Sequence, residues 1–168
     1  MTLSALNQLT PEQRQREHER CCGSTRWNML MAQRFPFQTK EELFAVAEEV
    51  WFKLLPNDWL EAFSHHPKIG DVASLRAKFA STRQWAKGEQ AGVSEASEAV
   101  LKALAEGNAH YENKFGYIFI VCATGKSAEE MLAILQARLL NDYATELQVA
   151  AEEQSKITRI RLEKLLID

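Results

Sequence analysis

The residues best suited to proton transfer stand together in one short string, His65-His66-Pro67-Lys68-Ile69-Gly70-Asp71. An imidazole exchanges protons near neutral pH, and Pro67 restricts the backbone beside it, which lowers the entropy lost on binding. Turns with such residues often carry functional sites. The alternative is a turn that only ends one helix while Asp71 caps the next, and spacing alone leaves both interpretations open.

A second polar string, Lys87-Gly88-Glu89-Gln90-Ala91-Gly92, could complete such a site. Its two glycines would let the backbone come close to a ligand. The Glu89 carboxylate could orient an imidazole or accept a ligand N–H, and Gln90 offers both amide donors and an acceptor. On its own, the string is also typical of a polar surface loop.

Other kinds of site find less support. Ala123-Thr124-Gly125-Lys126-Ser127 resembles the tail of a phosphate-binding loop but lacks the earlier glycine of the full pattern, so we reject nucleotide binding. Cys21, Cys22 and Cys122 are an odd number, and the adjacent pair cannot readily form a disulfide, which predicts free thiols in a reducing compartment. Neither a Cys-x-x-Cys nor a His-x-x-x-His pattern occurs at these positions, and we expect no metal site.

Helices must position the two strings. We expect helices after Ser4 and after Thr10-Pro11, a capping box at Thr39 and Glu42, and a short helix from Pro56 that stops at His65-His66. Proline disfavours helical geometry in the residue before it, so His66 is expected at a helix end or in a loop.

Helical signals continue through the second half of the chain. We expect helices over Val72 to Trp85, from a Ser94 cap to Gly116, and from a Ser127–Glu130 capping box onward. The last segment is too long for a compact domain, so we expect either a break at Asn141-Asp142 or a partner along its exposed length. Between these helices, the apolar run Tyr117 to Ala123 taken alone looks like a buried strand without a partner strand. Its backbone groups would need other partners, and a polar ligand could be one.

Composition places the chain among ordinary globular proteins. It has 168 residues, 46% of them hydrophobic and 26% charged, with a formal charge of -3. We expect one all-α domain over residues 1–168, a helical bundle with one short extended apolar segment near 117–123. Long basic runs and membrane-spanning stretches are absent from the sequence, which favours a small-molecule or protein partner over nucleic acid or membrane. The C-terminus lacks a Ser-Lys-Leu signal, and we expect a cytoplasmic protein.

The strings, in this order, resemble the 2-oxo-4-hydroxy-4-carboxy-5-ureidoimidazoline (OHCU) decarboxylase family, which forms allantoin at the end of urate degradation. The resemblance extends over nearly the whole chain, and the histidine–proline and Phe-Gly-Tyr-Ile-Phe strings are specific in combination. The matching segments are Leu6-Asn7, Cys22-Gly23-Ser24 with Trp27, Pro36-Phe37, His66 to Asp71, Glu89 to Gly92, Asn113 to Phe119, Cys122 to Gly125, and Arg161-Leu162.

The resemblance implies an all-helical fold, commonly a homodimer, and a decarboxylase that uses neither metal nor organic cofactor. By motif position, His66 would be the acid–base residue and Glu89 its companion. Arg161 would be the cation for an anionic substrate group, with Arg159 a close rival. The other implied substrate-binding residues are Pro67, Ala86, Gln90, Phe119, Ile120, Val121, Cys122 and Ala123.

Two positions depart from the family pattern. Ala86 stands where many relatives carry serine three residues before the glutamate, so a hydroxyl contact to substrate is lost there. Lys68 replaces an arginine that is frequent after the proline, and the bidentate geometry of arginine would not carry over.

Two alternatives remain at this stage. The chain could be a non-catalytic helical module that binds a partner along Met131 to Leu166, although this leaves His66 and Glu89 without a role. It could also be a cysteine enzyme that uses Cys22 or Cys122, but apolar and cap-like surroundings more commonly hold an inert thiol.

Overall fold

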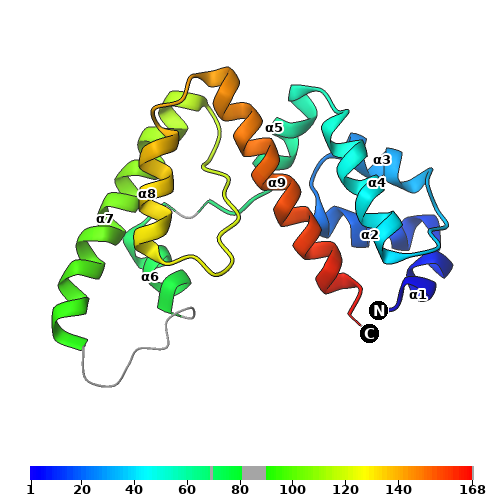
Figure 1. Ribbon diagram of the computed structural model, residues 1–168, viewed down its shortest axis with the longest axis horizontal. Coiled ribbons are helices and arrows are strands. Elements are labelled where there is room, and N and C mark those ends of the chain that lie inside the picture. Colours follow the sequence, from blue (N-terminus) through cyan, green and yellow to red (C-terminus); the bar gives the residue numbers. More distant parts are fainter. Residues whose placement is uncertain (69, 81–89, 168) are drawn as a thin grey trace. The chain divides into compact units, whose positions relative to one another are not determined.

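The computed structural model describes residues 1–68, 70–80 and 90–167, and these residues form helices joined by turns and irregular segments (Figure 1). The predicted all-α fold is confirmed, and no strand occurs within the described ranges. The helices are α1 (Leu3–Gln8), α2 (Pro11–Cys21), α3 (Thr25–Ala32), α4 (Lys40–Phe52), α5 (Pro56–Ser64), α6 (Val72–Ala80), α7 (Gln90–Phe115), α8 (Ala128–Arg138) and α9 (Tyr143–Leu165).

The described chain forms two compact units. Unit 1 contains residues 1–66, 120–122 and 147 to the C-terminus, and therefore α1 to α5 and most of α9. Unit 2 contains residues 67–119 and 123–146, and therefore α6, α7, α8 and the first turn of α9. The apolar run that looked like a buried strand is irregular backbone, and its residues 120–122 belong to unit 1.

Tryptophan side chains join the helices of unit 1. The indole N–H of Trp27 in α3 donates to the carbonyl of Ala47 in α4 at 3.0 Å. Trp51 in α4 donates to the carbonyl of Ala151 in α9 at 2.8 Å, and Trp59 in α5 donates to the carbonyl of Trp51 at 2.9 Å. All three side chains are buried, so each indole contributes apolar area to the core and still satisfies its polar atom.

Unit 2 is built around α7, which packs against both α6 and α8. A buried ion pair joins the end of α8 to the start of α9, because the Arg138 guanidinium lies 2.5 Å from Glu146 Oε1. The Tyr111 hydroxyl of α7 donates to the same carboxylate, and Asn141 Nδ2 donates to its other oxygen at 3.0 Å. These hydrogen bonds satisfy a carboxylate that is fully buried.

Local signals placed most helix ends correctly. Thr10 and Gln13 form a capping box ahead of Pro11, Ser127 and Glu130 form another, and the chain breaks between α8 and α9 as predicted at Asn141-Asp142. Gly116 ends α7 with a φ of 78°, a conformation that favours glycine.

Three predicted caps were wrong in detail. The first helix is capped by Thr2, two residues earlier than the Ser4 signal. The side chain of Thr39 caps α4, but the Glu42 carboxylate accepts from Gln38 N–H instead of completing the capping box. Ser94 lies within α7, which begins at Gln90, so residues 90–92 are helical and do not belong to a loop. None of the described helices is long and apolar enough to cross a membrane.

Candidate active site

His66 lies in the turn that follows α5, as the sequence predicts. The helix ends at Ser64, His65 is its C-cap, and the backbone N–H of His66 donates to the carbonyl of Phe63 at 3.2 Å. Farther along the same string, Asp71 Oδ1 accepts from the backbone N–H of Ser74 at 2.6 Å. The string therefore ends one helix and caps the next, and this structural role does not exclude a chemical role for His66.

Gly23 allows a second segment to lie directly against this turn. A Cβ added at Gly23 would stand 2.5 Å from both Cβ and Cγ of His65, closer than real carbon atoms approach. The neighbouring Thr25 N–H donates to Glu61 Oε1 of α5 at 2.5 Å. The Cys22-Gly23-Ser24 string thus supports the backbone that carries His66.

A line of buried side chains leads from His66 into unit 1. His66 Nε2 lies 2.5 Å from Gln154 Oε1, and Gln154 Nε2 donates to Thr158 Oγ1 at 3.1 Å. The Thr158 hydroxyl in turn lies within hydrogen-bonding reach of the Cys22 thiol. Gln154 is completely buried and Thr158 is buried, whereas His66 is half-buried, so the imidazole stands at the outer end of this line.

The electrostatic environment favours the neutral imidazole. Burial is the main cause that lowers the pKa of His66 below its ordinary value. The hydrogen bond to Gln154 raises this pKa, while the charges of Arg161 and His65 lower it further. His66 is therefore prepared to accept a proton at neutral pH.

The two candidate arginines have different surroundings. Arg161 is half-buried, lowers the pKa of His66 through its charge, and donates a long hydrogen bond of 3.4 Å to the carbonyl of Cys21. Arg159 is exposed, forms an ion pair with Glu163 at 2.6 Å and lies 4.0 Å from the centre of the Phe44 ring. Only the first of these arginines is among the groups whose charge acts on His66.

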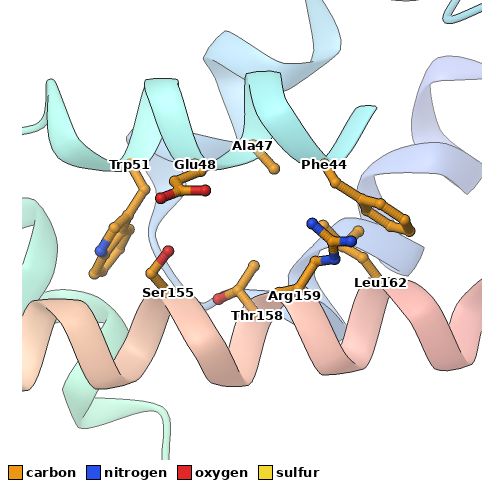
Figure 2. A pocket seen from close by; sticks show the side chains of 8 residues that line it. All are labelled: Phe44, Ala47, Glu48, Trp51, Ser155, Thr158, Arg159 and Leu162. Atoms are coloured by element: carbon orange, nitrogen blue, oxygen red, sulfur yellow. The ribbon is translucent and has the colours of Figure 1, made fainter. Parts of the chain in front are cut away.

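Arg159 faces a small pocket between α4 and α9 (Figure 2). In the close-up, Ser155, Thr158 and Arg159 project from α9 toward α4, and Glu48 projects from α4 toward α9. His66 does not belong to the lining, which consists of Phe44, Ala47, Glu48, Trp51, Ser155, Thr158, Arg159 and Leu162.

The remaining residues of the predicted site are distributed along the chain. Ile120, Val121 and Cys122 belong to unit 1, where Ile120 and Cys122 are buried. Pro67, Phe119 and Ala123 belong to unit 2, and Gln90 is the first residue of α7. Ala86 and Glu89 lie outside the described residues.

The thiols are poorly suited to nucleophilic chemistry. Burial raises the pKa of Cys21 to about 11 and that of Cys22 to about 12, and Cys122 is also buried. Since the thiolate is the reactive form, these surroundings argue against the cysteine-enzyme alternative.

Comparison with known proteins identifies the family. The family model described as OHCU decarboxylase matches residues 7–163. This chain belongs to the OHCU decarboxylase family. It is 39% identical over 149 residues to the uric acid degradation bifunctional protein TTL of Arabidopsis thaliana, which covers 88% of the chain. It is also 34% identical over 103 residues, 60% of the chain, to the 2-oxo-4-hydroxy-4-carboxy-5-ureidoimidazoline decarboxylase of Amia calva.

Solved structures agree with this assignment. A crystal structure of OHCU decarboxylase in the presence of (S)-allantoin is 38% identical, with a TM-score of 0.73 over 90% of this chain and 98% of that chain. A crystal structure of (S)-allantoin synthase has a TM-score of 0.70 at 18% identity, which supports the fold alone. The chain spans 46% of the Arabidopsis protein and 57% of the Amia protein.

Gln154 and Thr158 were not predicted from the sequence, although Gln154 contacts both His66 and Thr158. A possible signal is their spacing, because two polar residues four positions apart share one face of a helix. That face is otherwise apolar near the C-terminus, where Leu147, Ala150, Ala151 and Leu162 are buried. Their partner His66, however, is 88 residues away from Gln154 along the chain.

Proposed function

We propose that this member of the OHCU decarboxylase family removes the carboxyl group of 2-oxo-4-hydroxy-4-carboxy-5-ureidoimidazoline to give (S)-allantoin and CO2, without a cofactor. The observation that carries the proposal is a half-buried, largely neutral imidazole, His66, at the position that the family motif assigns to the acid–base residue. The charge of Arg161 acts on the same imidazole, and this arginine can attract an anionic substrate.

The substrate can act as its own electron sink. Carbon 4 carries both the hydroxyl and the carboxylate, and the imidazoline ring contains an adjacent C=N bond. When the bond to the carboxylate breaks, CO2 leaves and the electron pair spreads into this imine, where nearby donors stabilise the charge. The negative charge of the carboxylate thereby passes to the imine nitrogen, which takes up one proton from solvent.

The hydroxyl must then become a carbonyl while the neighbouring carbon gains a hydrogen. The hydroxyl loses one proton, and the ring carbon receives one on a single face, which sets the hand of the product. We propose that His66 exchanges these protons, first as the base and then as the acid. General acid–base catalysis of this kind contributes about 10²- to 10⁴-fold to a rate.

The other predicted residues receive roles by motif position. Arg161 holds the substrate carboxylate, and Pro67, Gln90 and the backbone of Phe119 to Ala123 contact the ring. Because Gln154 already faces Nε2 of His66, the role that we propose for Glu89 is a hydrogen bond to the ureido group. Lys68 forms an ion pair with Glu112 at 2.8 Å, so its charge is already paired within unit 2.

Circular dichroism at an allantoin band tests the proposal. Substrate freshly generated from urate is added to purified protein, and the appearance of one allantoin enantiomer is compared with a buffer control. We expect faster and one-handed formation with the protein. Folded protein that gives the buffer rate would contradict the proposal, and the binding-module alternative would then be tested by whether allantoin raises the Tm.

Three broader predictions accompany the activity. The chain is expected to be one OHCU decarboxylase-like domain over residues 1–168, to form a homodimer and to act in the cytoplasm. Light scattering on an eluting size-exclusion peak measures the oligomeric state directly. A monomeric mass at the concentrations of the activity assay would contradict the homodimer.

A further inference from the structure

Gln154 contacts the proposed acid–base residue but has no part in the chemistry described above. It lies in α9 with its side chain completely buried, and its two amide atoms have different partners. Oε1 lies 2.5 Å from His66 Nε2, while Nε2 donates to Thr158 Oγ1 at 3.1 Å. A buried glutamine whose amide oxygen and nitrogen both have hydrogen-bond partners costs little free energy to bury, and the two hydrogen bonds hold it in place.

The hydrogen bonds along this line determine which way the amide points. The Thr158 hydroxyl oxygen accepts a hydrogen bond from Gln154 Nε2. Gln154 therefore directs its N–H toward Thr158 and its carbonyl oxygen toward His66. A carbonyl oxygen can only accept, and the ring nitrogen that faces it must carry a hydrogen.

We propose that Gln154 is a positioning residue, which accepts a hydrogen bond from His66 Nε2–H and so holds the neutral imidazole in the tautomer with its lone pair on Nδ1. Nδ1 is then the atom that exchanges protons with the substrate. The identity of the reaction rests on the proposed function, whereas the tautomer does not.

The surroundings of His66 make this choice of tautomer matter. Among the described residues, the charged and titratable groups that act on the ring are Arg161 from α9 and the adjacent His65, and both disfavour a second proton. The ring therefore spends most of its time neutral at pH 7. Without a fixed acceptor, a neutral imidazole divides between two tautomers, and only one of them presents a basic Nδ1.

Nitrogen NMR on histidine-labelled wild-type protein at pH 8 tests the tautomer without any substrate. The chain has four histidines, and the signals of His66 are those lost in His66→Asn. We expect a protonated Nε2 and an unprotonated Nδ1. A hydrogen on Nδ1 would overturn the proposal. The expected tautomer in a protein without decarboxylase activity would support the hydrogen bond and contradict the proposed function, so the two failures are distinguishable.

Two substitutions of Gln154 then test the role in the reaction. Gln154→Met keeps the length but removes the acceptor, and we expect kcat to fall about 10- to 100-fold, the size of effect known for residues that orient metal-binding histidines, with little change in KM. Gln154→Glu keeps an acceptor and adds a negative charge, which favours the imidazolium. It should retain kcat at high pH and move the acidic limb of the kcat profile to higher pH.

A neighbouring hydroxyl provides the matched control. Ser155 lies on the same helix but projects toward α4 (Figure 2), and Ser155→Ala should leave both kcat and the pH profile unchanged. The proposal is overturned if Gln154→Met keeps the wild-type kcat, or if the pH profile of Gln154→Glu coincides with that of the wild type. If Gln154→Met does not fold, the Gln154→Glu profile and the wild-type spectrum still decide the question.

Discussion

Replacing Gly23 with alanine should disable the turn that carries His66 without touching any proposed catalytic atom. The added Cβ would stand 2.5 Å from Cβ and Cγ of His65. Because carbon atoms pack best at about 3.5 to 4.0 Å, the two segments must separate by about 1 Å. These two His65 atoms lie next to the backbone, so rotation of the side chain cannot relieve the clash at Cβ.

The magnitude follows from this displacement. Overpacking of this kind costs about 1–3 kcal/mol in the free energy of unfolding, and a misplacement of about 1 Å can lower a rate about 10²-fold. We therefore expect Gly23→Ala to fold, to unfold at a lower urea concentration, and to lose kcat by a larger factor than its stability predicts. Allantoin formation followed by circular dichroism and urea unfolding measure the two effects on one preparation.

Gly107→Ala is the matched control, because its Cβ would stand 2.6 Å from Leu135 Cδ2 in unit 2. The obstructing atom is the end of a flexible side chain, and alanine gains about 1 kcal/mol of helix propensity over glycine. This variant should keep the wild-type kcat. Equal kcat values for Gly23→Ala and the wild type would refute the argument that the Gly23 contact holds the turn in place.

Three further predictions concern single side chains. Burial lowers the pKa of His18 to about 4. Between this pH and about 6.5, His18 is protonated only in the unfolded chain, so the free energy of unfolding should fall by about 3 kcal/mol as the pH drops through this interval. Urea unfolding at several pH values should show a weaker dependence in His18→Met, and an unchanged dependence would contradict the assignment. Arg161→Ala should raise KM or lower kcat/KM, whereas Arg159→Ala should leave both unchanged; the opposite pattern would transfer the anion-binding role to Arg159. Cys21 and Cys22, with pKa values raised to about 11 and 12, should resist a thiol reagent until the protein unfolds, and rapid labelling of native protein with loss of activity would revive the cysteine alternative.

Local features of the fold could be predicted because their causes lie within a few residues. Pro11 at a helix start, the Ser127–Glu130 capping box and Gly116 at a helix end each act on adjacent backbone groups. Ser94 was wrongly predicted as an N-cap for the same reason. It resembles an N-cap, but α7 already begins at Gln90, and the packing of this long helix against α6 and α8 outweighs a local preference.

The surroundings of His66 could not be predicted in this way. The His65–Asp71 string predicted a titratable residue at a helix end, and the structure confirms that position. Its contact with Gln154 joins residues 88 positions apart, and the contact of Gly23 with His65 joins the end of α2 to the end of α5. Such contacts depend on how the helices pack, and no pattern within a single element encodes them.

The most direct test of the account compares the rate of (S)-allantoin formation by wild-type protein and by His66→Asn, followed by circular dichroism on freshly generated substrate. Asparagine keeps a polar side chain but cannot exchange protons at neutral pH. We expect rapid one-handed product with the wild type and a kcat lower by about 10²- to 10⁴-fold in the variant. A folded His66→Asn protein with the wild-type kcat would contradict the assignment of His66 as the acid–base residue.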